Sequence, residues 1–276
     1  MTTIGTPQPQ YAQIAELVRA RIADGTYPRG VPLPSEDRLA EEFGVSRVTI
    51  NRAIGLLRAS GDVKVRRGVG TVVRTLPRIT RDVTTRHATD SRQPPPPSRA
   101  ADSEISGMGL RPRTDYREVG ETTPPPVVTR ILGITEADRV LVRRRVHYAD
   151  EDPTEMADSY YPLPVVERCP DLRDVDGGCG GAYVPLAAAG LTPVRFTEDV
   201  DVRVPTEEEQ RVLDLEPTQV VFHTVHVAYT FDGDPLEVCM HVMPGHLWTL
   251  RYGWDDRAEE VPEPTGGSHH AHHPAR

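Results

Sequence analysis

The stretch LPSEDRLAEEFGVSRVTINRAIGLL, residues 33–57, contains the signals for two short helices joined by a tight turn. Ser35 and Ser46 each precede a helical pattern, and a serine there can accept a hydrogen bond from a backbone N–H of the first turn. Gly44 lies between the two patterns and permits the backbone conformation of a sharp turn. The stretch therefore predicts a helix-turn-helix whose second helix begins after Ser46.

The sequence on either side of this stretch completes a small domain. Residues 10–25 place apolar side chains at helical spacing and end at a glycine, which predicts a first helix. Residues 62–67 and 70–75 are typical of two short strands with glycines between them. Three helices followed by a two-stranded wing are the elements of a winged helix-turn-helix.

These residues resemble the N-terminal DNA-binding domain of the GntR family of bacterial transcription regulators. The resemblance rests on the LPSE turn at 33–36, the VSR triplet at 45–47 and the glycine-rich wing RRGVGTVV at 66–73. It implies that double-stranded operator DNA is a partner of the chain. Many family members have arginine where this chain has Asp37 and Asn51, and these departures bear on the operator sequence rather than on the fold.

The predicted second helix carries side chains suited to base contacts. In a helix-turn-helix this helix enters the major groove with its N-terminal residues first. The guanidinium of Arg47 fits O6 and N7 of guanine, and the amide of Asn51 fits adenine. In the wing, Arg66 and Arg67 are placed to reach phosphates or the minor groove. The full set of predicted DNA-contacting residues is Ser35, Arg38, Ser46, Arg47, Thr49, Asn51, Arg52, Arg66, Arg67 and Gly68.

Charge is distributed unevenly along the 276 residues. The net charge is −9, yet residues 1–75 hold 11 basic and 7 acidic residues, a balance of +4. The remainder holds 21 basic and 34 acidic residues, a balance of −13. A basic DNA-reading unit joined to an acidic sensor has this asymmetry.

Composition also indicates the compartment. No apolar run reaches the roughly 18–20 residues that span a bilayer, and the first residues lack the order of a secretory signal. Three cysteines are an odd number and lie too far apart in sequence for a disulfide framework. We therefore expect a cytoplasmic protein with no membrane partner.

At roughly 100–200 residues per domain, the length predicts two domains. We place the winged helix-turn-helix at residues 1–75, a linker with a proline-rich loop at 76–102, a second domain at 103–253 and a disordered, histidine-rich tail at 254–276. The expected fold class is α+β, in which the C-terminal domain contains an antiparallel sheet.

Strand patterns support this fold class for the second domain. Residues 139–148 and 219–231 alternate in the manner of strands. The second segment continues through Asp232-Gly233 into PLEVCMHVMP at 235–244, which predicts a hairpin.

This second domain is similar to the UTRA effector-binding domain of the histidine-utilisation-repressor branch of the same family. The landmarks are SGMGLRPRTD at 106–115, LVRRRVHYADEDPTEMADSYYP at 141–162, GGAYVPLAAAGLTP at 180–193 and GDPLEVCMHVMPGHLWTLRY at 233–252. The resemblance implies a chorismate-lyase-like fold, a small-molecule effector and a homodimer.

The UTRA resemblance also implies an effector cavity lined by arginines that grip anionic groups. Arg143 and Arg145 match those arginines, and strand alternation turns Arg144 to the other face. Solvated surface charge is the alternative for these arginines, and an exposed edge charge is the alternative for Glu237. The predicted effector-binding residues are Arg143, Arg145, Asp158, Ser159 and Glu237.

Two features of phosphosugar-sensing family members are absent. RAAD at 99–102 and GGAY at 180–183 stand where these members have a serine-phenylalanine-threonine stretch and a further serine. We therefore expect an organic acid or an amphipathic metabolite that pairs with arginine, and not a phosphosugar.

Catalytic and metal chemistry have little support in the sequence. No nucleophile stands beside a base at a recognisable spacing, and His223 and His226 fall on opposite faces of a strand. We expect no catalytic residue, cofactor or metal site, and a homodimeric repressor that a small molecule releases from an inverted-repeat operator. Two alternatives remain: an enzyme of chorismate-lyase-like fold fused to a DNA-binding domain, and a repressor that works without a ligand.

Overall fold

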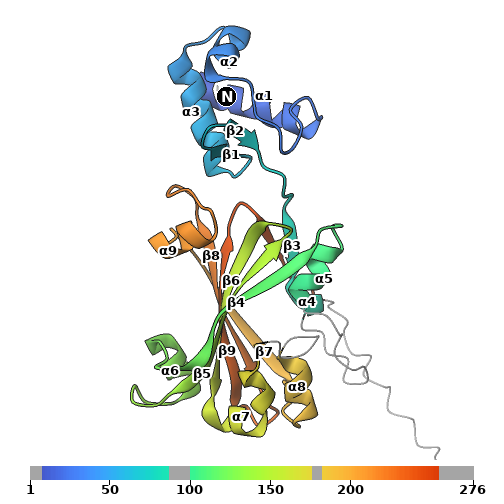
Figure 1. Ribbon diagram of the computed structural model, residues 1–276, viewed down its shortest axis with the longest axis vertical. Helices are drawn as coiled ribbons and strands as arrows, with labels where there is room; N and C mark the ends of the chain where they lie inside the picture. Colours follow the sequence, from blue (N-terminus) through green and yellow to red (C-terminus); the bar gives the residue numbers. More distant parts are fainter. Residues whose placement is uncertain (1–7, 87–99, 176–181, 255–276) are drawn as a thin grey trace, which may run out of the picture.

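The computed structural model describes residues 8–86, 100–175 and 182–254, which form a small head and a larger body (Figure 1). Strands β1 and β2 of the head pair antiparallel and follow three helices, so the head is the predicted winged helix-turn-helix. Its elements are α1 (Gln10–Ala23), α2 (Glu36–Phe43), α3 (Arg47–Ala59), β1 (Val63–Arg66) and β2 (Gly70–Val73).

Serine caps fix where two helices of the head begin. The Ser35 hydroxyl accepts a hydrogen bond from the Arg38 N–H at 3.3 Å, and the Ser46 hydroxyl accepts one from the Thr49 N–H at 3.2 Å. Gly44 follows α2 with a φ of 63°, in the left-handed region where a side chain is unfavourable. These three positions set the turn between α2 and α3.

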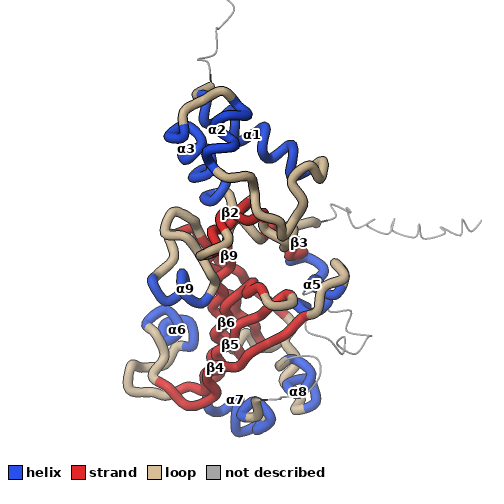
Figure 2. The backbone as a smooth tube through the Cα atoms, turned by 45° about the horizontal axis from the view of Figure 1, so that its top comes forward, coloured by secondary structure: helices blue, strands red, loops and turns tan. Residues whose placement is uncertain are grey.

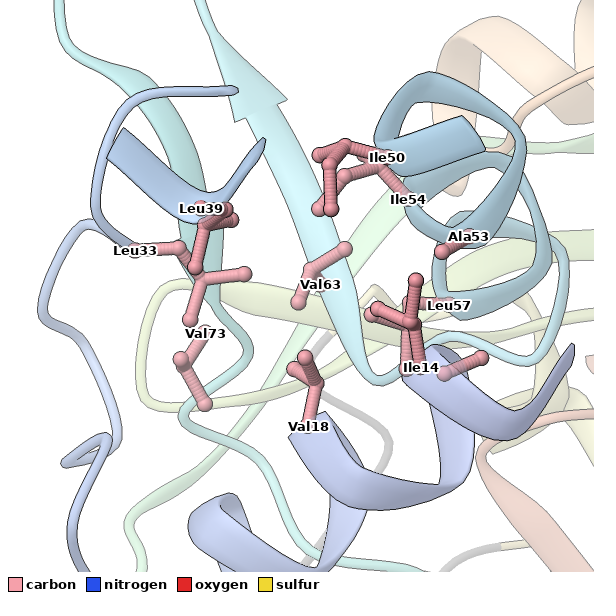
Figure 3. Packing of buried hydrophobic residues seen from close by; sticks show 11 residues of the cluster. Ile14, Val18, Leu33, Leu39, Ile50, Ala53, Ile54, Leu57, Val63 and Val73 are labelled. Atoms are coloured by element: carbon pink, nitrogen blue, oxygen red, sulfur yellow. The ribbon is translucent and has the colours of Figure 1, made fainter. Parts of the chain in front are cut away.

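The apolar side of α3 anchors the core of the head (Figure 3). Ile50 and Leu57 have no exposed surface. They pack with residues of α1, of α2 and of both wing strands, so one continuous core holds α3 against the wing. The buried cluster consists of Ile14, Ala15, Val18, Leu33, Leu39, Ile50, Ala53, Ile54, Leu57, Val63 and Val73.

A six-stranded antiparallel sheet forms the centre of the body. Its strand order is β4-β5-β6-β9-β8-β7, so the expected α+β class with an antiparallel sheet is confirmed. The strands are β4 (Pro112–Thr122), β5 (Val140–Ala149), β6 (Asp152–Pro162), β7 (Arg195–Arg203), β8 (Val221–Tyr229) and β9 (Pro235–Pro244).

Short helices surround the sheet (Figure 2). Val128 packs on one face, among valines of β5, β8 and β9. Val166 and Leu186 pack with Leu141 on the opposite face. No helix within the described ranges is both long enough and apolar enough to cross a membrane. The helical elements of the body are α4 (Val83–Arg86), α5 (Ala100–Ser106), α6 (Pro126–Leu132), α7 (Leu163–Arg168), the 3-10 turn η1 (Pro170–Arg173), α8 (Tyr183–Ala188) and α9 (Glu207–Val212).

Part of the interval assigned to a linker is folded into the body. Strand β3 (Ile79–Asp82) pairs in parallel with β10 (Trp248–Arg251), outside the six-stranded sheet. The linker expectation for 76–102 is wrong over this strand. Its two buried residues are Ile79 and Arg81, so it lacks an alternating apolar pattern and depends on β10, which is remote in sequence.

Leu57→Ala should lower the free energy of unfolding of the head by about 2–5 kcal/mol, because it removes fully buried methyl groups and leaves a cavity. Leu56 is the next residue of α3 and is 38% exposed, so Leu56→Ala is the matched control. The control should change the unfolding free energy by less than about 0.5 kcal/mol. Urea unfolding followed by circular dichroism measures both, and equal midpoints would contradict the assignment of the buried side of α3.

Candidate functional site

The N-terminal part of α3 presents the predicted base-reading side chains to solvent. Arg47 and Asn51 are both exposed, and both contact Glu36 of α2. Arg47 Nε lies 3.1 Å from Glu36 Oε2, and Asn51 Nδ2 donates to Glu36 Oε1 at 3.2 Å. The hydrogen bond to Glu36 and the nearby charge of Asp37 raise the pKa of Arg47. The base contacts expected of these two side chains would therefore replace their contacts with the Glu36 carboxylate.

The remaining residues predicted to contact DNA are of two kinds: those that cap or begin a helix, and those whose side chains are exposed. Ser46 Oγ lies 2.9 Å from Thr49 Oγ1, so these two hydroxyls are already paired within the turn. Val48 was missed from the sequence; it is 64% exposed beside Arg47 and suits contact with a thymine methyl group. The signal in the sequence is that Val48 is an apolar residue outside the helical spacing of the buried residues of α3. The exposed predicted residues are Arg38, Arg52, Arg66, Arg67 and Gly68.

One face of the sheet carries a row of buried polar side chains across five strands. From β5 to β7 the row consists of Arg143, Ser159, Cys239, His226 and Glu198. Buried polar groups are unfavourable unless they find hydrogen-bond partners. Such a row therefore marks the face as specialised, whereas the opposite face is packed with valines.

Arg145 and Glu237 lie on the same face, next to this row. Arg145 Nη1 donates to Ser159 Oγ at 2.8 Å, and Arg145 Nη2 lies 3.7 Å from Cys239 Sγ. Tyr161 OH donates to Glu237 Oε1 at 2.6 Å. The structure thus brings together four of the five predicted effector-binding residues: Arg143, Arg145, Ser159 and Glu237.

Arg143 holds neighbouring segments of the chain in place. Its Nη1 donates to the carbonyl oxygens of Leu172 and Asp174, the latter at 2.7 Å. Its Nη2 donates to Tyr116 OH at 3.1 Å, and the guanidinium lies 4.8 Å from the centre of that ring. A hollow of about 500 Å³ adjoins the polar face at Tyr116; it is lined by Asp102, Pro112, Arg113, Thr114, Asp115, Tyr116 and Val175.

Asp158 is separated from the other predicted effector residues. It precedes Ser159 in β6, so the two side chains point to opposite faces of the sheet. Asp158 Oδ2 lies 3.5 Å from Arg144 Nε on that other face. The expectation that Asp158 shares a site with Arg143 and Arg145 is therefore wrong.

Charges and hydrogen bonds set the protonation of the polar face. Burial alone would raise the pKa of Glu237, but hydrogen bonds from Ser159 and Tyr161 and the charge of Arg145 lower it, so Glu237 remains a carboxylate. Burial raises the pKa of Cys239 to about 12, so its thiol stays protonated near neutral pH. Around Arg145, the face therefore presents a fixed guanidinium charge beside the carboxylate of Glu237.

A further set of polar residues extends this face toward β3 and was missed from the sequence. His226 Nε2 lies 3.0 Å from Tyr183 OH, and His226 Nδ1 lies 3.3 Å from Glu198 Oε1. Arg81 of β3 forms a buried ion pair with the same Glu198. No local sequence pattern predicts this set, because its members come from β3, β7, β8 and α8 and meet only in the folded chain.

Some sequence expectations lie outside the described residues: those on Cys179, on the prolines at 94–97 and on the histidine-rich tail beyond residue 254. Cys169 and Cys239 are buried and free. In the described parts of the chain, no three histidine, cysteine, aspartate or glutamate side chains gather in a way that could hold a metal ion.

Two family models match the chain, one for each part of the structure. Residues 10–73 match the model for bacterial regulatory proteins of the gntR family. Residues 107–247 match the model for the UTRA domain. The first match covers the head, and the second covers the sheet and its helices.

Known transcriptional regulators are similar to this chain, some over most of its length. An uncharacterised HTH-type transcriptional regulator of Streptomyces coelicolor is 30% identical over 249 residues, which cover 89% of this chain and 91% of that protein. The histidine utilization repressor of Pseudomonas aeruginosa is 31% identical over 154 residues, 56% of each chain. A crystal structure of a GntR-family transcriptional regulator has a TM-score of 0.56 and 26% identity, and the match covers 91% of this chain and 99% of that chain.

Arg47→Ala should weaken binding to the specific operator by about 1–3 kcal/mol, because it would remove the bidentate base contact expected of this guanidinium. Arg66→Ala would remove the phosphate contact expected of the wing, so it should weaken binding to all sequences alike. It should also lower the slope of log affinity against log salt concentration by about one. Fluorescence anisotropy with specific and scrambled duplexes over a range of salt concentrations measures both effects. Equal loss of sequence discrimination in the two variants would show that the roles are assigned wrongly.

Proposed function

Because the chain belongs to the GntR family of bacterial transcriptional regulators with a UTRA effector-binding domain, we propose that it represses its target genes until a metabolite binds. DNA binding by the head and effector binding by the body are properties of this family. The observation that carries the proposal is the pairing, in one chain, of an exposed recognition helix with a buried polar face that contains Arg145. It would act in the cytoplasm, where the chromosome lies.

The proposed operator is an inverted repeat bound by a homodimer. The base-reading residues of α3 span only about one turn, from Arg47 to Asn51, and one such helix reads a few base pairs. Two heads related by twofold symmetry read two half-sites, which supplies the missing specificity. The names of relatives such as the histidine utilization repressor support repression as the outcome of binding.

The proposed effector carries an anionic group that Arg145 grips. Arg145 donates to Ser159 and to the sulfur of Cys239, which is a weak acceptor. A carboxylate oxygen in place of that sulfur would form a shorter, charge-assisted bond. Arg143 donates instead to backbone carbonyls, so it supports the wall of the site. Glu237 is ionised and suits a hydroxyl or amine on the same ligand.

An organic acid fits these residues better than a phosphosugar. The segments at 99–102 and 180–183 lack the hydroxyl side chains that accompany phosphosugar binding in the family. The body is proposed to sense its ligand without transforming it. The pKa of Cys239 is raised to about 12 and that of Tyr183 is raised well above its usual value, in both cases chiefly by burial, so these groups stay protonated and are poor nucleophiles.

Sedimentation velocity should show a dimer, and anisotropy should show one dimer bound to each inverted repeat. Binding to a duplex with a single half-site should be weaker by about tenfold or more, because the second head then loses its base contacts. A monomer that binds a single half-site with full affinity would contradict the proposal.

Arg145→Lys should abolish release from the operator while leaving the affinity for DNA within about twofold, because lysine keeps the charge but loses the planar fork. Arg144→Lys, on the other face of the sheet, is the matched control and should respond as the wild type does. The effector is first found by screening organic acids for release of labelled operator, and the variants are then titrated with it. Loss of operator binding by Arg145→Lys in the absence of acid would mean that Arg145 is structural.

A further inference from the structure

Opposite charges line the contact between the head and the body. The head contributes Arg58 at the end of α3 and Lys64 in β1. The body contributes Asp152 at the start of β6, and Asp214 and Glu216 after α9. Figure 1 shows this contact between the lower end of the head and the loops at the upper end of the sheet.

The end of the recognition helix is held by two kinds of contact. Arg58 Nη2 lies 2.6 Å from Glu216 Oε2. Gln219 is buried, and its Nε2 donates to the carbonyl oxygen of Arg58 at 2.8 Å. Gln219 Oε1 in turn accepts from the Glu216 N–H at 2.9 Å. One short loop of the body therefore grips both the side chain and the backbone of the last turn of α3.

The wing is held by a separate ion pair. Lys64 Nζ lies 3.0 Å from Asp152 Oδ1 and 3.7 Å from Asp214 Oδ2. The Lys64 side chain is only 15% exposed, so this pair is less screened by water than a typical surface pair. Thr75 Oγ1 also donates to Asp152 Oδ2, at 3.2 Å. Lys64 is the single lysine in the chain.

The two parts touch at the level of the backbone as well. Gly61 lies between α3 and β1 with a φ of 75°, and a Cβ atom there would come within 2.1 Å of His246 Cδ2. Glycine is required at this position by the left-handed conformation and by the close approach of the body. The head and the body are therefore closely packed at Gly61 in addition to being joined by ion pairs.

We propose that Arg58, Lys64, Asp152, Asp214 and Glu216 form an electrostatic latch that fixes the orientation of the DNA-reading head on the effector domain. The latch leaves the base-reading residues available. Arg58 lies eleven residues after Arg47, which is about 16 Å along the helix axis. Latch and operator therefore occupy opposite ends of α3 and can be engaged together.

The latch has a consequence for operator choice, and this consequence rests on the proposed homodimer. With each head fixed on its body, the dimer presents two recognition helices at one separation and angle. Each base pair added between the half-sites turns one of them by about 35° around the duplex. A latched dimer would therefore accept one half-site spacing and reject its neighbours, whereas unlatched heads would accept several.

Carbodiimide coupling tests the latch directly, because Lys64 carries the only lysine amine. The reagent activates a carboxylate, the amine attacks it, and one amide bond forms while the carboxylate oxygen leaves as part of the urea. The full-length protein should yield an amide between Lys64 and Asp152 or Asp214 within one chain, identified by peptide mass spectrometry. Lys64→Arg keeps the charge but should abolish this product. About 1 M salt should lower the yield, because it screens the ion pairs.

A charge swap between Arg58 and Glu216 tests whether the coupling yield depends on docking of the head, because neither residue takes part in the coupling reaction. Glu216→Arg places a like charge against Arg58 and should lower the Lys64 coupling yield by about tenfold. Adding Arg58→Glu restores opposite charges and should restore the yield. Glu167→Arg, on α7 away from the head, is the control and should leave it unchanged. A yield that is the same in all four proteins, or coupling of Lys64 only to other carboxylates or only between chains, would overturn the latch.

Operator spacing supplies the second readout, on duplexes first selected from a random library. Two added base pairs between the half-sites should weaken binding of the wild type by about tenfold or more, and binding of Glu216→Arg by less than about threefold. Equal losses in both proteins would overturn the role of the latch in spacing. The coupling result does not depend on dimerisation or on an inverted repeat. It would therefore still test the latch if the proposed function were wrong.

Discussion

The buried ion pair between Arg81 and Glu198 is the constraint on which the joining of the two domains depends. Arg81 belongs to β3, and only residues 74–78 separate that strand from the last strand of the wing. Both side chains are almost wholly removed from water, and loss of Arg81 would leave the buried carboxylate of Glu198 without its guanidinium partner. Strand β3 is therefore fixed at one place on the sheet, and the head is rooted there by a short segment.

The same ion pair forms one border of the polar face. Glu104 and Glu155 also lie near Arg81, and three carboxylates around one guanidinium would leave an excess of negative charge. Burial and the charge of Glu155 raise the pKa of Glu104 to about 8, so Glu104 keeps its proton near neutral pH. His241 hydrogen-bonds to Glu155 at the inner edge of this group. The charges of this face are thus balanced within the protein. An anionic ligand would add negative charge to this face, and the face includes the Arg81–Glu198 pair that holds β3.

Sequence reasoning predicted the head almost completely and the body only in part, for a physical reason. The caps at Ser35 and Ser46 act within a single helical turn, so a local reading finds them. Strands β5, β8 and β9 alternate visibly, but their order in the sheet depends on pairing between distant segments, and so does the position of β3. In the candidate site, alternation allows only one of Asp158 and Ser159 to face the arginines, and the pairing of β6 with β5 decides for Ser159. Arg81 could not be found, because a lone charged residue in a presumed linker gives no sign of burial.

Two attachments of different character hold the head. The root at β3 is a buried strand and ion pair, which can be lost only when part of the body unfolds. The latch consists of partly exposed ion pairs, whose individual contributions are small and which separate without unfolding. A rigid head held at both points has one orientation, and a head held only at its root can turn about residues 74–78. The head has a closed core of its own, so the shape of the recognition helix is the same in both cases. With the proposed latch, control of DNA binding by the body would act on the placement of the recognition helix rather than on its internal structure.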